Sequence, residues 1–304
     1  MIKRTVEIST RGISLSVDLG QLVLSQDGQV LDRIPIEDMG VLIVASTGVT
    51  YTHAVIARLL AAGAVIVACD DHFLPCGLLL PQDNSLQVQR LTAQVKAGKP
   101  LLKQLWRQLI KAKITNQAEL LDHTPSVQSA LRAMAARVRS GDPENLEAQA
   151  ARRYWQAFLG PDFRRDADGL PPNSRLNYGY TVLRAAVARA LAGAGLHPSL
   201  GLHHHNRSNS FCLADDLMEP LRPMVDRRVK AIGASGEPQL EKETRRELLG
   251  VLTETVSIDG AAGPLTVALE RMAASLVHCL EGQSKKLLIP KPWKSADIDS
   301  CGSS

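Results

Sequence analysis

The pattern of apolar and polar positions divides the chain into a strand-rich head and a longer helical body. Between residues 2 and 50, short alternating segments separated by glycines predict five strands: Thr5–Ile8, Ile13–Val17, Gln21–Ser25, Val30–Ile36 and Val41–Ala45. The dipeptide Asp27-Gly28 between the third and fourth strands is typical of a hairpin turn. Helical spacing over 51–62, then an apolar run over 64–68, predicts a helix leading into a buried strand. A last strand is expected over 76–80.

From about residue 88 to near 282 the apolar spacing is helical, with breaks at glycine and proline pairs. The sequence therefore predicts an α+β fold. We expect a small N-terminal β-strand domain over residues 1–85, a larger all-helical C-terminal domain over 86–290 and a mobile tail over 291–304. The linker is placed at Gln82–Gln87. A length of 304 residues, above the usual size of one domain, agrees with two domains.

Composition restricts the class of protein. The net charge of +4 permits a polyanionic partner without requiring one. Five cysteines include no C-x-x-C pair and leave an odd one, which favours a reducing cytoplasm over a disulfide framework. The first ten residues are too polar for a signal peptide, and no apolar run approaches the ~20 residues of a membrane span. We expect a cytoplasmic protein with no membrane partner.

The candidate chemistry is concentrated between Gly201 and Pro223. Three histidines, 203–205, precede a polar turn, and the acids Asp215, Asp216 and Glu219 follow it. An imidazole facing carboxylates gives a mixed nitrogen and oxygen site that suits Mg²⁺ or Mn²⁺. The alternative is a solvated turn followed by a helix that Asp215 caps and whose positive end the acids favour.

A distant acid extends this hypothesis. Asp142 and Pro143 predict a helix start, as the N-cap and the first helical residue, and Glu147 lies one turn further. Its neighbours at one-turn spacing are mostly small or apolar, so an inward Glu147 must be paired or metal-bound. A salt bridge to Arg222 or Arg152 is the alternative.

A second possible metal site, made of His53 with Asp70-Asp71-His72, is the weaker hypothesis, because acids after a strand commonly make turns.

A cation held by Glu147, His204 and Glu219 together would keep open coordination positions to which a phosphodiester could bind. The chain contains no G-x-S-x-G elbow, Walker loop or dinucleotide fingerprint.

Basic residues surround these segments. Any one of them alone is a solvated charge, but together they resemble a surface that positions phosphates without reading sequence. The DNA-binding candidates are Arg152, Arg153, Arg207, Arg222, Lys285 and Lys286, with Arg164, Arg165, Arg227 and Arg228 nearby. Tyr154, Trp155 and Tyr178 are more typical of a core than of base stacking.

Four motifs carry a resemblance to a known family. They are Gly141-Asp142-Pro143 with Asn145 and Glu147-Ala148, then Leu176–Tyr180, Gly195-Leu196, and the segment from Asp216 to Pro223. On these motifs the sequence resembles the CRISPR-associated integrases of the Cas1 family, in particular their type II branch. The strands of the head resemble the small β domain of that family, so the resemblance covers nearly the whole chain.

The resemblance implies a metal-dependent DNA endonuclease and integrase that inserts spacer DNA into a CRISPR array by 3′-hydroxyl attack on a phosphodiester. It implies that the helical domain is catalytic, with Glu147, His204 and Glu219 at the family's metal positions and Mg²⁺ or Mn²⁺ as the cofactor. His204 is chosen because the family's glycine precedes its histidine by three residues, as Gly201 does here, and His205 is the alternative.

The resemblance also implies partners. They are double-stranded DNA, as spacer precursor and CRISPR repeat, a second copy of the chain that dimerises through the head, and the small Cas2 protein; the type II effector nuclease is a further candidate. Two other functions stay open on sequence alone: a metal-dependent nuclease that only hydrolyses, and a non-enzymatic DNA-binding scaffold.

Overall fold

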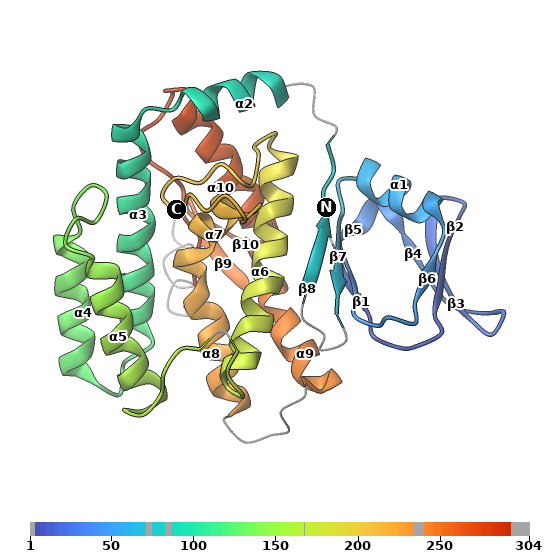
Figure 1. Cartoon of the computed structure of the whole chain (residues 1–304), viewed down its shortest axis with the longest axis horizontal. Coiled ribbons are helices and arrows are strands. Elements are labelled where there is room, and N and C mark those ends of the chain that lie inside the picture. The colour runs from blue at the N-terminus through green and yellow to red at the C-terminus, as the bar shows by residue number, and fades with distance from the viewer. Residues whose placement is uncertain (1–3, 71–74, 83–86, 167, 234–239, 293–304) are drawn as a thin grey trace, which may run out of the picture.

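The computed structural model describes residues 4–70, 75–82, 87–166, 168–233 and 240–292. In the described part of the chain, the head contains two four-stranded sheets and one α-helix (Figure 1). The first sheet has the order β1-β5-β7-β8, and the second has the order β4-β3-β2-β6. The bounds are β1 Arg4–Ile8, β2 Ser14–Asp18, β3 Gln21–Gln26, β4 Gln29–Pro35, η1 Ile36–Asp38, β5 Met39–Val44, β6 Thr50–Tyr51, α1 His53–Ala61, β7 Val65–Cys69 and β8 Pro75–Leu79.

The first sheet is buried on both faces. Since alternate residues of a strand point to opposite sides of the sheet, each strand contributes to two different cores. On β5, Leu42 packs into the core of the head, with Leu15 and Leu22 of the second sheet. Its neighbours Val41 and Ile43 belong to the core of the helical body. The head and the body therefore meet across this sheet.

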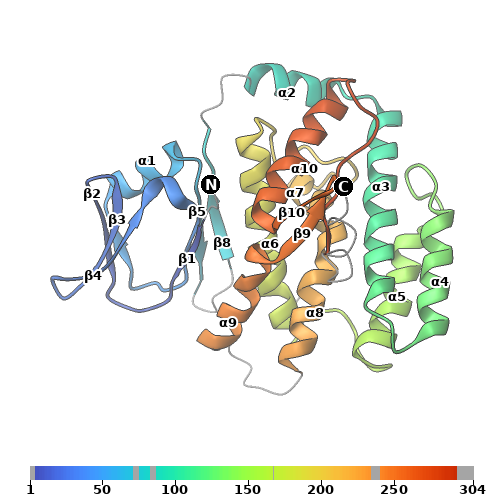
Figure 2. The same ribbon diagram turned by 180° about the vertical axis from the view of Figure 1, so that it is seen from behind.

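In the body, the long helix α6 packs against α7, α8, α9 and α10, and it also contacts β5, β7 and β8 of the head (Figures 1 and 2). Helix α3 packs against α4 and α5. The helices of the body are α2 Gln87–Lys96, α3 Lys99–Glu119, α4 Pro125–Arg137, α5 Leu146–Leu159, α6 Asn173–Gly193, α7 Cys212–Met218, η2 Glu219–Leu221, α8 Arg222–Ile232, α9 Lys242–Leu249, η3 Gly250–Thr253 and α10 Leu265–Leu280. None of the described helices is long and apolar enough to cross a membrane.

The prediction of an all-helical body is wrong. Strands β9 (Thr255–Ile258) and β10 (Ala261–Pro264) form a hairpin, and β11 (Lys291–Pro292) pairs with the other edge of β9. The connecting Asp259 and Gly260 both have positive φ, as a tight hairpin requires. This Asp-Gly pair is the same kind of signal as Asp27-Gly28 in the head, but it lies within residues 88–282, where the sequence predicted only helices. The expected tail over 291–304 thus begins with a paired strand, and 293–304 lie outside the described residues.

In the head, the predicted strands and the Asp27-Gly28 hairpin are confirmed, and both turn residues have positive φ. Strand β6 was not predicted, and it shifts the start of α1 from Tyr51 to His53. Four cysteines, Cys69, Cys76, Cys212 and Cys279, are free thiols. Most of the predicted linker, residues 83–86, lies outside the described part of the chain.

Candidate metal site

Glu147 is placed by the turn before α5. Asn145, with φ 50°, is the residue that precedes the helix, and Asp142 also has a positive φ. Asp142 is therefore not the N-cap, and Pro143 lies in the turn, outside the helix. The Asp142 carboxylate nevertheless accepts the backbone N–H groups of Leu146 and Glu147, both at 2.9 Å. It satisfies two free donors of the first turn and orients Glu147.

Glu219 comes from the junction of α7 and η2. Met218 ends α7, and Glu219 begins η2 with its side chain only 7% exposed. The prediction that Asp215 caps this helix is wrong, because Phe211 precedes the helix and Asp215 lies inside it. The Asp215 carboxylate binds Arg184 Nε and Asn209 Nδ2, both at 2.7 Å.

Asp216 organises the loop that carries the histidines. Its fully buried carboxylate accepts the backbone N–H groups of Leu202 at 2.6 Å and His203 at 2.8 Å. It also lies 2.5 Å from Nδ1 of His204. A Cβ on Gly201 would come within 2.3 Å of the His204 carbonyl oxygen, so only glycine fits this turn. Asp216 therefore acts on the histidine loop through direct contacts.

The three histidines have different environments. His203 stacks on Trp106 of α3, with 4.3 Å between ring centroids, and His204 meets the same indole edge-on at 5.5 Å. Burial lowers the pKa of His203. The pKa of His204 is raised, first by the Asp216 hydrogen bond and further by the charges of Glu219 and Glu147. His205 is exposed and lines a cavity to which Gln94 and Leu200 also contribute. Both acids thus act on the imidazole of His204.

Lys113 connects the two acids and was missed by the sequence analysis. Its Nζ forms ion pairs with Glu147 and, at 2.5 Å, with Glu219, and its side chain is 9% exposed. The expected alternative for Glu147, an ion pair with Arg222 or Arg152, is replaced by this contact. A signal was present: Lys113 lies on the same helical face as the buried Leu109 and Ile110. A lysine at a core position requires charged partners.

Arg222 completes the charge balance. Its Nε donates to Glu219 Oε1 at 2.8 Å, and its guanidinium lies 4.5 Å from the centre of the Tyr180 ring. Burial alone would raise the pKa of Glu219, but the charges of Arg222 and Lys113 lower it to about 2. The pKa of Lys113 is raised, since Glu219 and Glu147 outweigh the effect of burial. These groups stay charged at neutral pH.

Behind the site, Asp226 of α8 is buried between two tyrosine hydroxyls. Tyr154 donates to it at 2.9 Å and Tyr180 at 2.5 Å. Burial raises the pKa of Asp226 to about 7, and the hydrogen bonds only partly oppose this rise. Tyr154 and Tyr178 are fully buried, as expected of core residues.

Asp226 predicts a pH effect on stability. Between about pH 4 and 7 the folded state keeps the proton while the unfolded state releases it, so this group lowers the unfolding free energy as pH rises. We expect Asp226→Asn to flatten that decline and to gain a few °C in Tm over the parent at pH 8, with a smaller difference at pH 5. Thermal unfolding at the two pH values measures it. An equal difference at both would contradict the assignment.

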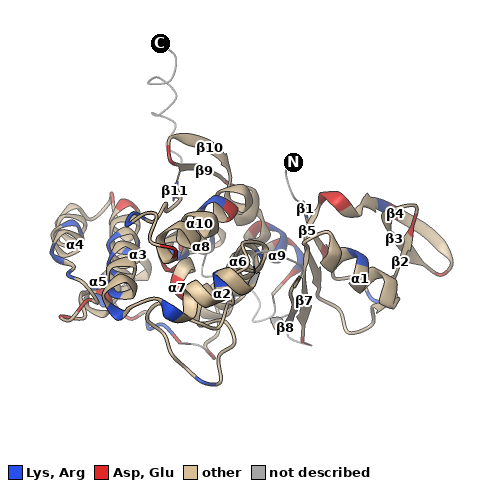
Figure 3. Ribbon diagram, turned by 90° about the horizontal axis from the view of Figure 1, so that it is seen from above, with Lys and Arg blue, Asp and Glu red and all other residues tan. Residues whose placement is uncertain are grey.

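The basic candidates separate into two groups. Arg152, Arg153, Arg207, Lys285 and Lys286 are exposed. Arg222 instead belongs to the acid cluster, so its guanidinium is engaged by Glu219. Of the nearby residues, Arg227 and Arg228 both pair with Glu254. Lys and Arg positions are spread over many elements of the body (Figure 3).

The second metal set is not assembled in the described part of the chain. His53 begins α1 with an exposed side chain, and Asp71 and His72 lie outside the described residues. Among the described residues, no group of three or more His, Cys, Asp or Glu side chains is arranged to hold a metal ion. This finding also holds for Glu147, His204 and Glu219, and in that set Lys113 forms ion pairs with both acids.

Comparison with known proteins decides the family. The sequence profile of the family described as CRISPR associated protein Cas1 matches residues 6–256. The chain belongs to the Cas1 family. A CRISPR-associated endonuclease Cas1 of Neisseria meningitidis serogroup C is 38% identical over 286 residues, which cover 92% of this chain and 93% of the relative. A Cas1 endonuclease of Pyrobaculum aerophilum is 28% identical over 294 residues, covering 90% and 98%.

Solved structures agree with the Cas1 fold. A casposase bound to its integration product superposes with a TM-score of 0.76 at 22% identity, covering 99% of this chain and 98% of its own. A Cas1 protein from Thermotoga maritima gives 0.72 at 16% identity, covering 92% and 98%. The chain of a Cas6-RT-Cas1–Cas2 complex gives 0.75 at 20% identity, with 96% of this chain and 36% of that one covered.

Proposed function

We propose that this Cas1 protein is a metal-dependent DNA endonuclease and integrase of CRISPR adaptation, of the type II branch, which joins the 3′-hydroxyl end of spacer DNA to a phosphodiester of the CRISPR repeat. The observation that carries the proposal is the convergence of Glu147 and Glu219, 72 positions apart in the printed sequence, on one ammonium group, with His204 in their field. The names of the relatives, an endonuclease and a casposase, support this class of reaction.

The donor set fits Mg²⁺ or Mn²⁺. Two carboxylates and one imidazole are a mixed oxygen and nitrogen set of the kind these ions accept. Oε2 of Glu219 is buried and accepts no hydrogen bond of good geometry, although Lys113 Nζ lies 2.5 Å away. A cation already compensates this oxygen, so a divalent ion that replaces the ammonium meets compatible ligands. We propose Glu147, His204 and Glu219 as the metal ligands.

When bound there, the ion stabilises negative charge on the phosphoryl oxygens and lowers the pKa of a coordinated hydroxyl. The protein's own contribution is to hold the ligands ready. Asp216 accepts a hydrogen bond from Nδ1–H of His204, which leaves the Nε2 lone pair free, an arrangement common for metal-binding histidines. Arg222 keeps Glu219 ionised. The exposed arginines and lysines add DNA affinity without reading sequence.

The proposed partners rest on the chain's membership of the Cas1 family. We propose a homodimer, with a mass in solution of twice the 32.9 kDa of one chain, that assembles with a Cas2 protein and double-stranded DNA in the cytoplasm. Val30 and Leu31 on the edge strand β4 are 53% and 56% exposed and would be covered by a second copy. The type II effector nuclease remains a further candidate partner.

The test is an integration assay with a repeat-containing plasmid, a DNA fragment ending in a 3′-hydroxyl and the Cas2 partner, with Mn²⁺ and with chelator. We expect joined products only with the metal. Cleavage without joining would favour a nuclease that only hydrolyses. DNA binding that ignores the chelator, with no strand cut or joined under any divalent ion, would favour a non-enzymatic scaffold.

A further inference from the structure

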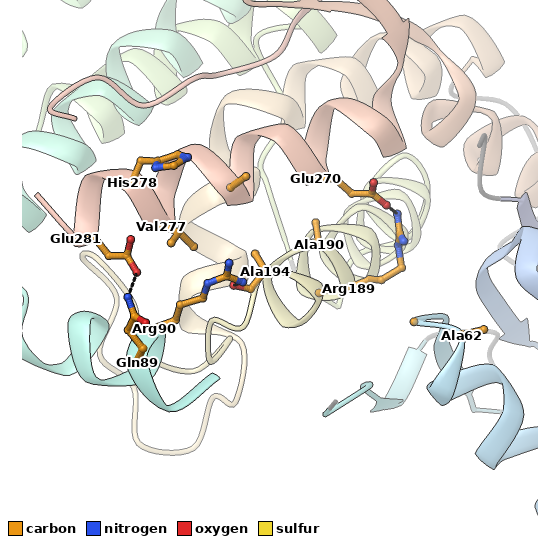
Figure 4. A pocket seen from close by; sticks show the side chains of 13 residues that line it. Ala62, Gln89, Arg90, Arg189, Ala190, Ala194, Glu270, Val277, His278 and Glu281 are labelled. Atoms are coloured by element: carbon orange, nitrogen blue, oxygen red, sulfur yellow. Dashed lines mark hydrogen bonds and ion pairs between the residues drawn. The ribbon is translucent and has the colours of Figure 1, made fainter. Parts of the chain in front are cut away.

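Helix α2, the first helix after the strand-rich head, reaches the loop that carries the histidines. It lies across the C-terminal ends of α6 and α10 (Figure 1). Figure 4 shows Arg90 extending from α2 toward Ala194, just after α6, and Arg90 Nη1 donates to the Ala194 carbonyl oxygen at 2.6 Å. Gln94 lies one helical turn further along the same face.

Gln94 binds the loop with both ends of its amide. Its Oε1 accepts the backbone N–H of His197 at 2.9 Å. Its Nε2 donates to the carbonyl oxygens of His197 at 2.9 Å and Leu200 at 3.1 Å. The side chain is 8% exposed. A buried amide that makes three hydrogen bonds to the backbone of one short segment fixes the course of that segment.

The loop is thereby held from both sides of Gly201. Gln94 binds the residues before it, 197–200, and Asp216 binds the residues after it, 202–204. A Cβ on Gly201 would already meet Asp216 Oδ2 at 3.0 Å and Cys212 Cβ at 3.0 Å, so the turn has no room for adjustment. With the loop held on both sides of Gly201, we expect a displacement at Leu200 to reach the contact between Asp216 and His204.

Apolar packing does not explain why Gln94 is buried. The neighbouring Val95, on a different face of α2, is 66% exposed, and Val88 is 80% exposed. Ala93 of α2 packs against the core of the body, but these larger apolar side chains face solvent while the amide is buried, so the contacts of Gln94 and Arg90 with the loop contribute to the orientation of α2.

We propose that Gln94 is a positioning residue that holds the histidine loop in the arrangement in which His204 binds metal. Its hydrogen bonds go to the backbone of residues 197–200, and it acts on the loop through that segment. The inference rests on the proposed metal role of His204, and it adds α2 to the elements on which that role depends.

The test compares Gln94→Ala with Gln89→Ala. The control lies on the same helix, but Gln89 donates a hydrogen bond to Glu281, just after α10, instead of to the loop (Figure 4). In the metal-free protein we expect the amides of Leu202 and His203 to exchange hydrogen at least about 10-fold faster in Gln94→Ala, with no change in Gln89→Ala. Calorimetric titration should show Mn²⁺ binding about 10–100-fold weaker in Gln94→Ala alone. High Mn²⁺ should restore strand transfer in Gln94→Ala.

Gln94→Glu keeps the acceptor for His197 N–H and loses the two donated bonds, so its affinity should fall between those of the parent and the alanine variant. Unchanged exchange at Leu202 and His203 in Gln94→Ala overturns the proposal, and so does faster exchange with unchanged Mn²⁺ affinity. If the parent protein binds no Mn²⁺ at all, the proposed function fails instead, and the exchange rates alone decide whether Gln94 positions the loop.

Discussion

Glu147→Gln is expected to reduce strand transfer at least about 100-fold while DNA binding stays near the parental level. The amide keeps the shape of the side chain but removes the charge that a divalent ion needs. DNA affinity depends on many dispersed basic contacts and is not lost with one acid. Glu147 is the better choice of acid because its side chain is 29% exposed, whereas Glu219 is 7% exposed. Integration and gel-shift assays on the same preparation measure both effects.

Glu219→Gln and His204→Ala should lose strand transfer to a similar extent. Glu219→Gln should also lose stability, because Lys113 and Arg222 are left with too little opposing charge. His205→Ala is the matched control and should keep most activity. His203→Ala is a poorer control, since His203 stacks on Trp106. An inactive His205→Ala with an active His204→Ala would move the ligand by one residue, and normal integration by all three ligand variants would refute the metal site.

Lys113→Met is expected to destabilise the metal-free protein by about 3–5 kcal/mol, the usual cost of removing one partner from a buried charge cluster. Its ammonium is the group that both acids share, and without it Arg222 is left as the ion-pair partner of Glu219. A divalent ion should offset this loss. Added Mn²⁺ should therefore raise the Tm of the variant by more than it raises that of the parent.

Lys113→Arg keeps the positive charge and serves as the comparison, although its planar head group does not fit the space of an ammonium closely. Thermal unfolding with chelator and with saturating Mn²⁺ measures the effect. An unchanged Tm of Lys113→Met in chelator would show that the lysine does not hold the acids together. Equal metal-induced increases in both proteins would show that the ion does not take its place.

The strands of the head could be predicted because their signals are local. Period-two alternation places Leu42 on one face and Val41 and Ile43 on the other, and Asp27-Gly28 supplies the positive φ that a tight hairpin needs. The hairpin of β9 and β10 carries a comparable Asp259-Gly260 signal, yet its strands are only four residues long between helices. Short elements give too few alternating positions to be separated from a helix break.

The sequence by itself was sufficient to identify the family motifs and the types of residue at the candidate site, since the acids at 147 and 219 and the run of histidines are visible without a structure. The helix-capping rules predicted the local structure around these residues less reliably. Asp142 and Asp215 were both expected to be N-caps, but Asn145 and Phe211 are the residues that precede the two helices. A cap depends on the backbone angles of one residue, which neighbouring segments also influence.

Only the tertiary structure decided how these residues act together. Lys113 lies 34 positions from Glu147 and 106 from Glu219 in the printed sequence, and Gln94 lies 103 from His197, so no periodic pattern connects them. The different environments of His203 and His204 depend on Asp216 of α7 and Trp106 of α3. A buried charge or amide takes whichever partners the packed helices bring within about 3 Å, and that proximity is a property of packing that a linear pattern does not contain.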